Sequence, residues 1–111
     1  MTPSRSEITS RLVLVVLPAE IDITNAGQVR TQLNQEFQAG RAVIADLTAT
    51  MFCDSSGTVA LLRASREAAA LGVELRLAVS PASQVSRVLE LTGFASQLRL
   101  FPSVAEATAG S

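Results

Sequence analysis

Three short apolar runs, each followed by a segment with helical spacing, constrain the fold of this chain more than any other feature. They lie at residues 12–17, 42–47 and 73–79. Because strands that alternate with helices pair in parallel through right-handed crossovers, this order predicts an α/β fold. The first run is apolar throughout, so we expect both of its faces to be covered. The third run alternates apolar and polar residues, which predicts one partly solvated face.

Capping residues and glycines set the expected ends of the first two helices. Apolar residues recur at helical spacing over residues 26–37, after a possible cap at Thr24 or Asn25. Gly40 then stands where a left-handed residue commonly follows a helix. The second helix is expected to begin near residues 55–58 and to end at residue 72.

The remaining elements are predicted in the same way. Ser80 followed by a proline is typical of a helix start, and this third helix is expected to end at residue 93. A short strand follows at residues 98–101, and a capping box at residues 103–106 opens a final short helix. A strand at residues 6–9 is expected to form a hairpin with the first apolar run.

Together these elements predict one α/β domain over residues 1–111, with a core from about residue 8 to residue 107 and loose ends. The sheet is expected to be mixed, with four to five strands: an opening hairpin and then parallel strands. About four helices are expected, mainly on one face of the sheet.

The residue types that are missing exclude several kinds of chemistry. The chain has no His and no Lys, and Cys53 is its single cysteine. It therefore lacks the preferred ligands of a zinc site, the base of a Ser–His–Asp triad and the lysine of a phosphate-binding loop. We expect no metal, no cofactor and no catalytic residue. A lone cysteine also fits a reducing compartment.

Charge and hydropathy limit the classes of partner that the chain can bind. The net charge is −1, and all nine basic residues are arginines that form no cluster. Nucleic-acid binding needs concentrated positive charge, so we expect none. The apolar run at residues 12–17 is too short to cross a bilayer and lacks the cleavage pattern of a secretory signal. The sequence therefore predicts a cytoplasmic protein without membrane insertion.

Two acid-bearing loops follow predicted strands, at residues 20–22 and 46–57. In parallel sheets, sites gather at the carboxyl ends of the strands. Ser55 lies in the second loop and has two interpretations: a helix N-cap, or a phosphorylation site that the helix dipole favours and the neighbouring Asp54 opposes. Asp22 could likewise be a helix-capping acid, and Cys53 a small core residue.

The ordered set of motifs resembles the STAS domain family, whose type members are bacterial anti-sigma factor antagonists. Its signature is similar to Asp54-Ser55-Ser56-Gly57 in this chain. The other matching segments are residues 20–22, 26–37, 46–48, 52–53, 61–62, 80–94 and 101–107. The ordered set is more specific than any one motif.

The resemblance implies a function for Ser55, the residue directly after the aspartate of the signature. An anti-sigma factor that is also a serine kinase binds ATP and phosphorylates this serine, which ends the binding of antagonist to anti-sigma factor. A serine phosphatase reverses the modification. The chain itself is then not an enzyme. The expected partner-binding residues around the serine are Asp22, Thr24, Asp54, Ser56, Gly57 and Thr58.

Two alternatives stand beside this hypothesis. The same fold could serve as a regulatory or scaffold subunit of a stress-signalling complex or of a membrane lipid transporter. An enzyme with Ser55 or Asp54 as nucleophile is disfavoured, since no His or Lys is present to activate it. The chain departs from the family pattern at Ala19, at Cys53 and at residues 58–59. These departures leave the phosphoacceptor in place, but they bear on which kinase recognises the chain.

Overall fold

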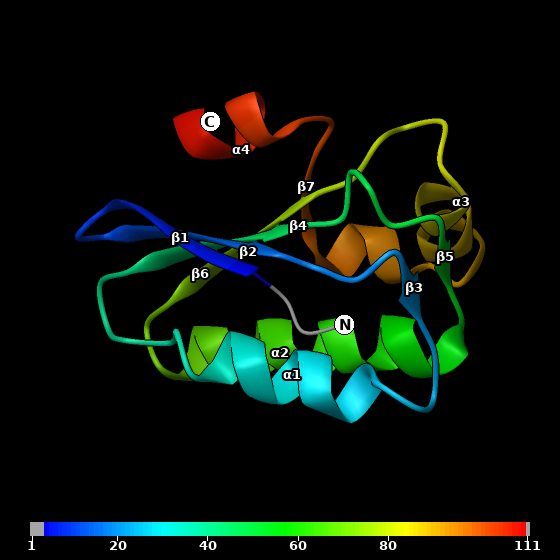
Figure 1. Cartoon of the computed structure of the whole chain (residues 1–111), viewed down its shortest axis with the longest axis horizontal. Helices are drawn as coiled ribbons and strands as arrows, with labels where there is room; N and C mark the ends of the chain where they lie inside the picture. Colours follow the sequence, from blue (N-terminus) through cyan, green and yellow to red (C-terminus); the bar gives the residue numbers. More distant parts are fainter. Residues whose placement is uncertain (1–3, 111) are drawn as a thin grey trace.

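Strands and helices alternate along the chain, as the apolar runs predict (Figure 1). The computed structural model describes residues 4–110. The strands are β1 (Ser4–Thr9), β2 (Leu12–Val16), β3 (Glu20–Ile21), β4 (Ala42–Asp46), β5 (Phe52–Cys53), β6 (Glu74–Ala78) and β7 (Arg99–Phe101). The helices are α1 (Ala26–Asn34), α2 (Ser55–Ala70), α3 (Gln84–Leu91) and α4 (Val104–Ala109), with a 3-10 turn, η1 (Phe94–Gln97), before β7.

Five of the strands form one mixed sheet in the order β1-β2-β4-β6-β7. β1 and β2 form the expected antiparallel hairpin, and every other neighbouring pair in this sheet is parallel. The fold class predicted from the sequence is therefore confirmed. β3 and β5, which the apolar pattern did not predict, pair in parallel as a separate two-stranded sheet.

The helices lie on both faces of the sheet but unequally. α1 and α2 lie side by side below the sheet in Figure 1, and α3 lies at the end of the molecule near β5. These three helices and the sheet enclose the larger core. α4 alone lies above the sheet, over a smaller core formed by Ile44, Ala78, Phe101 and Ala107.

The expectation that both faces of the first apolar run are covered is wrong for one face. Val13 and Val15 point into the larger core and are buried. Leu12, Leu14 and Val16 point the other way and are only half-buried. The reason is that α4 has six residues and packs on β4, β6 and β7, which leaves the β2 side of that face open.

Two helix ends also differ from the prediction. α1 ends at Asn34, but tight turns continue its direction, with the Phe37 amide donating to Asn34 at 3.1 Å, so that Phe37 still reaches the core. α3 begins after Ser83, whose hydroxyl accepts the Ser86 amide at 3.2 Å; the proline after Ser80 lies in the preceding turn. The capping hydroxyl of Ser83 therefore marks the start of α3.

The final helix is capped as expected at one end and held by an arginine at the other. The Ser103 hydroxyl accepts the Glu106 amide at 3.1 Å. On the sheet, Arg76 donates to the Ala107 carbonyl at 2.9 Å, close to the negative end of the helix dipole. The loose ends predicted from the sequence fall largely on residues outside the described part. Within residues 4–110, no helix combines the length and apolar character that crossing a membrane requires.

An ion pair joins α1 to α2 beneath the sheet. Arg30 donates to the Glu67 carboxylate through both Nε, at 2.9 Å, and Nη2, and Asn34 donates to Oε1 at 3.0 Å. These bonds, first of all those from Arg30, lower the pKa of Glu67 from its ordinary value of 4.5 to about 2. Because the pKa is lower in the folded chain, the ionised carboxylate stabilises the fold above pH 4.5.

We expect Glu67→Gln to lower the free energy of unfolding at pH 7 by less than about 1 kcal/mol, since both side chains are partly exposed. The difference between the two proteins should shrink as the pH falls from 4.5 through about 2, where Glu67 itself becomes neutral. Urea unfolding of both proteins at pH 7 and at low pH measures this difference in the free energy of unfolding. A difference that stays constant over that range would contradict the assigned ion pair.

Candidate functional site

The N-terminus of α2 lies at the carboxyl edge of the sheet, where the sequence places the candidate serine. Asp54 has extended backbone, and its Oδ1 accepts the Gly57 amide at 3.1 Å. Asp54 is therefore the N-cap, and Ser55 is the first residue of the helix. The interpretation of Ser55 as the cap is wrong, because the neighbouring carboxylate takes that role.

Ser55 combines a fixed backbone with an exposed side chain. Its carbonyl accepts the Thr58 hydroxyl at 3.0 Å, and the Thr58 amide in turn donates to the Asp54 carbonyl at 3.0 Å. The residue itself is exposed to solvent. Since capping does not occupy its hydroxyl, Ser55 presents this hydroxyl to any group that approaches the start of α2.

The short strands β3 and β5 hold this helix start in place. Ile21 pairs with Cys53, and the Asp54 amide then donates to the Ile21 carbonyl at 3.1 Å. On the other side of β5, the Gln84 side chain accepts the Cys53 amide at 3.0 Å and donates to the Cys53 carbonyl at 3.3 Å. Gln84 thus acts as a further strand would, a role that no sequence pattern indicated.

Gly57 allows the first turn of α2 to lie directly on β3 and β5. A Cβ at this position would lie 2.5 Å from the Cys53 sulfur and 2.8 Å from Cγ2 of Ile21. Such distances are far inside van der Waals contact, so only glycine fits here. Cys53 is fully buried, and burial, helped by the Asp54 charge, raises the pKa of its thiol to about 12. The thiol is therefore protonated at neutral pH and acts as core.

Asp22 lies beside the helix start because it follows β3 as Asp54 follows β5. Its Oδ1 accepts both the amide of Thr24, at 2.9 Å, and the Thr24 hydroxyl, and these bonds lower the pKa of the Asp22 carboxyl. Asn25 closes the turn: it accepts the Asp22 amide at 2.9 Å and donates to the Glu20 carbonyl at 2.8 Å. The structure therefore brings two carboxylates to the same edge as Ser55.

The residues predicted to contact a partner divide into two groups. Thr24 is exposed, and Asp22, Asp54 and Ser56 are half-buried, so these four reach the surface. Gly57 and Thr58 are buried behind Ser55. Their place in the structure gives them a supporting role: Gly57 permits the close contact with Cys53, and Thr58 holds the Ser55 carbonyl.

Sequence analysis missed a set of exposed apolar side chains around this site. Ile23, in the Asp22 turn, is 79% exposed, and Met51, just before β5, is 77% exposed. Phe52 is also exposed. Exposed large apolar residues that lie together near a functional group are typical of an interaction surface. Their signal was present in the sequence as apolar residues inside predicted loops.

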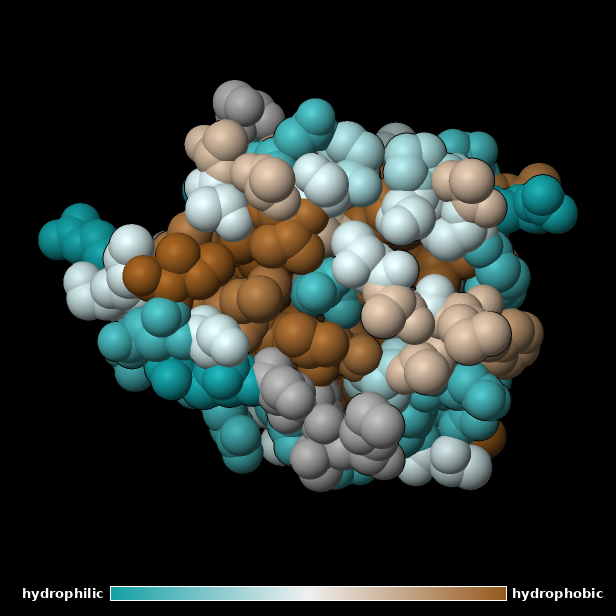
Figure 2. Space-filling model, turned by 45° about the horizontal axis from the view of Figure 1, so that its top comes forward, coloured by the Kyte–Doolittle hydropathy of each residue, from teal (hydrophilic) through white to brown (hydrophobic). Residues whose placement is uncertain are grey.

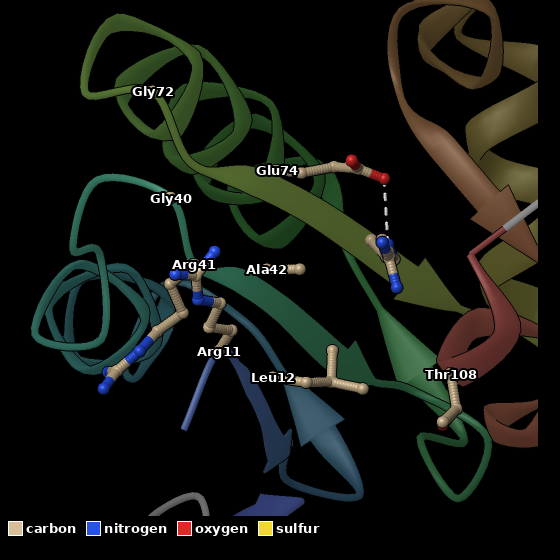
Figure 3. Close-up of a pocket in the computed structure, with 9 residues that line it drawn as sticks. Arg11, Leu12, Gly40, Arg41, Ala42, Gly72, Glu74 and Thr108 are labelled. Carbon is tan, nitrogen blue, oxygen red and sulfur yellow. Dashed lines mark hydrogen bonds and ion pairs between the residues drawn. The ribbon is translucent and has the colours of Figure 1, made fainter. Parts of the chain in front are cut away.

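A different part of the molecule contains a hollow with a volume of about 430 Å³. In Figure 3, Arg11 and Arg41 lie on one side of it and Glu74 and Thr108 on the other. It opens at the amino ends of the parallel strands, away from Ser55. Arg41 already pairs with Glu36 at 3.2 Å, and Arg76 with Glu74 at 2.8 Å, which reduces the charge available to a ligand. Among residues 4–110, no cluster of acidic or cysteine side chains fits a metal ion.

Comparisons with known proteins agree with this architecture. The family model of the STAS domain matches residues 4–107. An anti-sigma factor antagonist from Mycobacterium paratuberculosis has a TM-score of 0.84 at 21% identity, over 98% of this chain and 92% of that chain. SpoIIAA in its unphosphorylated form has a TM-score of 0.74 at 24% identity, over 96% of this chain and 93% of that chain.

The fold also occurs as part of a larger protein. The murine anion transporter Slc26a9 matches with a TM-score of 0.73 at 20% identity, over 94% of this chain but 18% of the transporter chain. No curated protein sequence matches the chain. At these identities the structural similarities show the fold alone. A function for this chain must be inferred from the residues around Ser55.

We expect Gly57→Ala to destabilise the protein by about 1–3 kcal/mol, because the new methyl group overlaps Cys53 and Ile21. Gly27→Ala is the matched control: it is also a helical glycine, and a Cβ there meets no heavy atom within 4 Å. That variant should be stabilised by up to about 1 kcal/mol. Thermal and urea unfolding compare the two. Equal stability of both variants would refute the close contact at Gly57.

Proposed function

The chain belongs to the STAS domain family, and from that membership we propose that it is an anti-sigma factor antagonist controlled by phosphorylation of Ser55. STAS domains of the antagonist type are regulatory proteins rather than enzymes. In the unphosphorylated form the chain binds an anti-sigma factor, and this binding frees the sigma factor. The protein acts in the cytoplasm, without binding nucleic acid and without inserting into a membrane.

The partner supplies the chemistry that this chain lacks. The anti-sigma factor is a serine kinase with bound ATP; it transfers the γ-phosphoryl group to the Ser55 oxygen, takes up the hydroxyl proton and releases ADP. A serine phosphatase hydrolyses the phosphoserine and restores the antagonist. The absence of His and Lys from the sequence is compatible with this division of labour.

The observation that carries the proposal is the arrangement of Asp54 and Ser55. Because Asp54 caps α2, the exposed Ser55 hydroxyl is left for the kinase. The fixed Ser55 carbonyl holds the residue in one backbone position, which suits a substrate that must align with a phosphoryl donor.

Electrostatics explain how the modification ends binding. A phosphate adds about −1.5 to −2 charges at neutral pH. It would lie next to Asp54 and near the ionised Asp22, and burying that charge in an interface requires its desolvation. A loss of a few kcal/mol of binding free energy weakens affinity about a hundredfold or more, since about 1.4 kcal/mol is tenfold. No rearrangement of the fold is needed.

A second candidate is a STAS regulatory or scaffold subunit of a stress-signalling complex or of a membrane lipid transporter. The observation in its favour is that the domain matched in Slc26a9 has the same fold inside a transporter. Affinity capture with the whole chain distinguishes the candidates, because recovery of a transporter subunit would favour the second and recovery of an ATP-binding anti-sigma factor the first.

We expect incubation with the anti-sigma factor kinase of the same genome and ATP to place phosphate on Ser55, and Ser55→Ala to abolish this labelling. Ser55→Ala should keep its affinity for the kinase, whereas Ser55→Glu should lose part of it, because a carboxylate carries less charge than a phosphate. Phosphopeptide mapping and calorimetry measure the two effects. Ser10→Glu, in the exposed turn after β1, is the control for added charge. Undiminished label in Ser55→Ala would refute the site.

We expect Ile23→Ala to weaken binding of the anti-sigma factor by about tenfold, because a large apolar side chain at an interface centre contributes strongly to affinity. Its stability should be unchanged, since the side chain is exposed. Leu71→Ala is the matched control: Leu71 is exposed and has the same size as Ile23, but it lies at the far end of α2. Equal affinities of the two variants would exclude Ile23 from the interface.

A further inference from the structure

β1 forms one edge of the five-stranded sheet. Its inner side pairs with β2, and within the described residues no strand pairs with its outer side. An edge of this kind presents N–H and C=O groups that can pair with another strand. The ladder with β2 is regular from Ser4 to Glu7, and a bulge follows, so the first part of β1 has the geometry that strand addition needs.

Two charged residues on β1 define which strand would fit. Arg5 and Glu7 are two residues apart and therefore lie on the same face, the face towards α1. Their side chains are 43% and 52% exposed. Glu36 in the segment after α1 accepts from Arg5 Nε at 2.8 Å, which fixes the guanidinium beside the strand. Nη2 of Arg5 also donates to Glu7 Oε1 of the same strand, at 3.4 Å. Because the guanidinium has five N–H groups, Arg5 can still donate to a further carboxylate.

These charges are complementary to a second copy of the same strand. We propose that β1 pairs with β1 of a second copy, antiparallel and around a two-fold axis at Ser6, to form a continuous ten-stranded sheet. In this register each Arg5 lies opposite Glu7 of the other copy, and symmetry makes two such pairs. Registers centred on Arg5 or on Glu7 would place like charges directly opposite, which destabilises strand pairing.

The opposite face of the hairpin supports a second copy as the occupant. Leu12, Leu14 and Val16 lie on the face that α4 leaves open, and Figure 2 shows a broad apolar area on this side of the molecule. Ile8, at the bulge in β1 itself, is 41% exposed, and an added strand would cover part of it. The net charge of −1 opposes association only weakly.

Analytical ultracentrifugation of the full chain over a wide concentration range tests the proposal. We expect the mass to rise from 11.6 kDa towards twice that value as concentration increases. Arg5→Glu and Glu7→Arg should each weaken self-association about tenfold or more, and the double exchange should restore it, because opposite charges face each other again. Arg11→Glu, in the turn of the same hairpin, makes the same charge change outside the paired segment and should have no effect.

Cross-linking tests the register independently. In the proposed pairing, the two Ser6 residues lie directly opposite each other, so Ser6→Cys should form a disulfide-linked dimer under mild oxidation. Ser10→Cys lies in the turn and should not, and the native Cys53 is buried. A monomer at all concentrations, a double exchange no better than the single variants, or equal cross-linking of both cysteine variants would overturn the proposal.

Discussion

The hydrogen bond from the Gly57 amide to the Asp54 carboxylate determines how the functional edge of this protein is built. It makes Asp54 the cap of α2 and moves Ser55 to the first helical position. If the serine capped the helix, its hydroxyl would be directed to the backbone of the next turn. Asp54 therefore stabilises the start of the helix, and the hydroxyl of Ser55 is not needed for capping.

The support beneath Ser55 consists of contacts that tolerate little change. The first turn of α2 rests at Gly57 on Ile21 and Cys53, and β5 is bonded on one side to β3 and on the other to Gln84. Thr58 ties its hydroxyl to the Ser55 carbonyl. Because these contacts hold the backbone beneath the exposed Ser55, phosphorylation there would change the charge and size of the surface rather than the shape of the domain.

Much of the fold could be predicted from sequence because its strands and helices carry strong periodic patterns. The apolar runs located β2, β4 and β6, and the capping box at Ser103 located α4. β3 and β5 have two residues each, too short for any period to appear. The role of Gln84 was equally hidden, since it depends on a contact between residues 31 positions apart in the chain. Capping by Asp54 rather than Ser55 could not be decided either, because both residue types cap helices well.

The double hydrogen bond of Gln84 to Cys53 links two parts of the domain that no strand connects. Gln84 is the first residue of α3. Its side-chain amide therefore couples the position of α3 to that of Cys53, directly before Asp54. Substitutions in α3 could therefore shift the position of Ser55 without any change in the residues at the start of α2. Two chains with an identical loop at residues 54–57 could in this way present the serine differently.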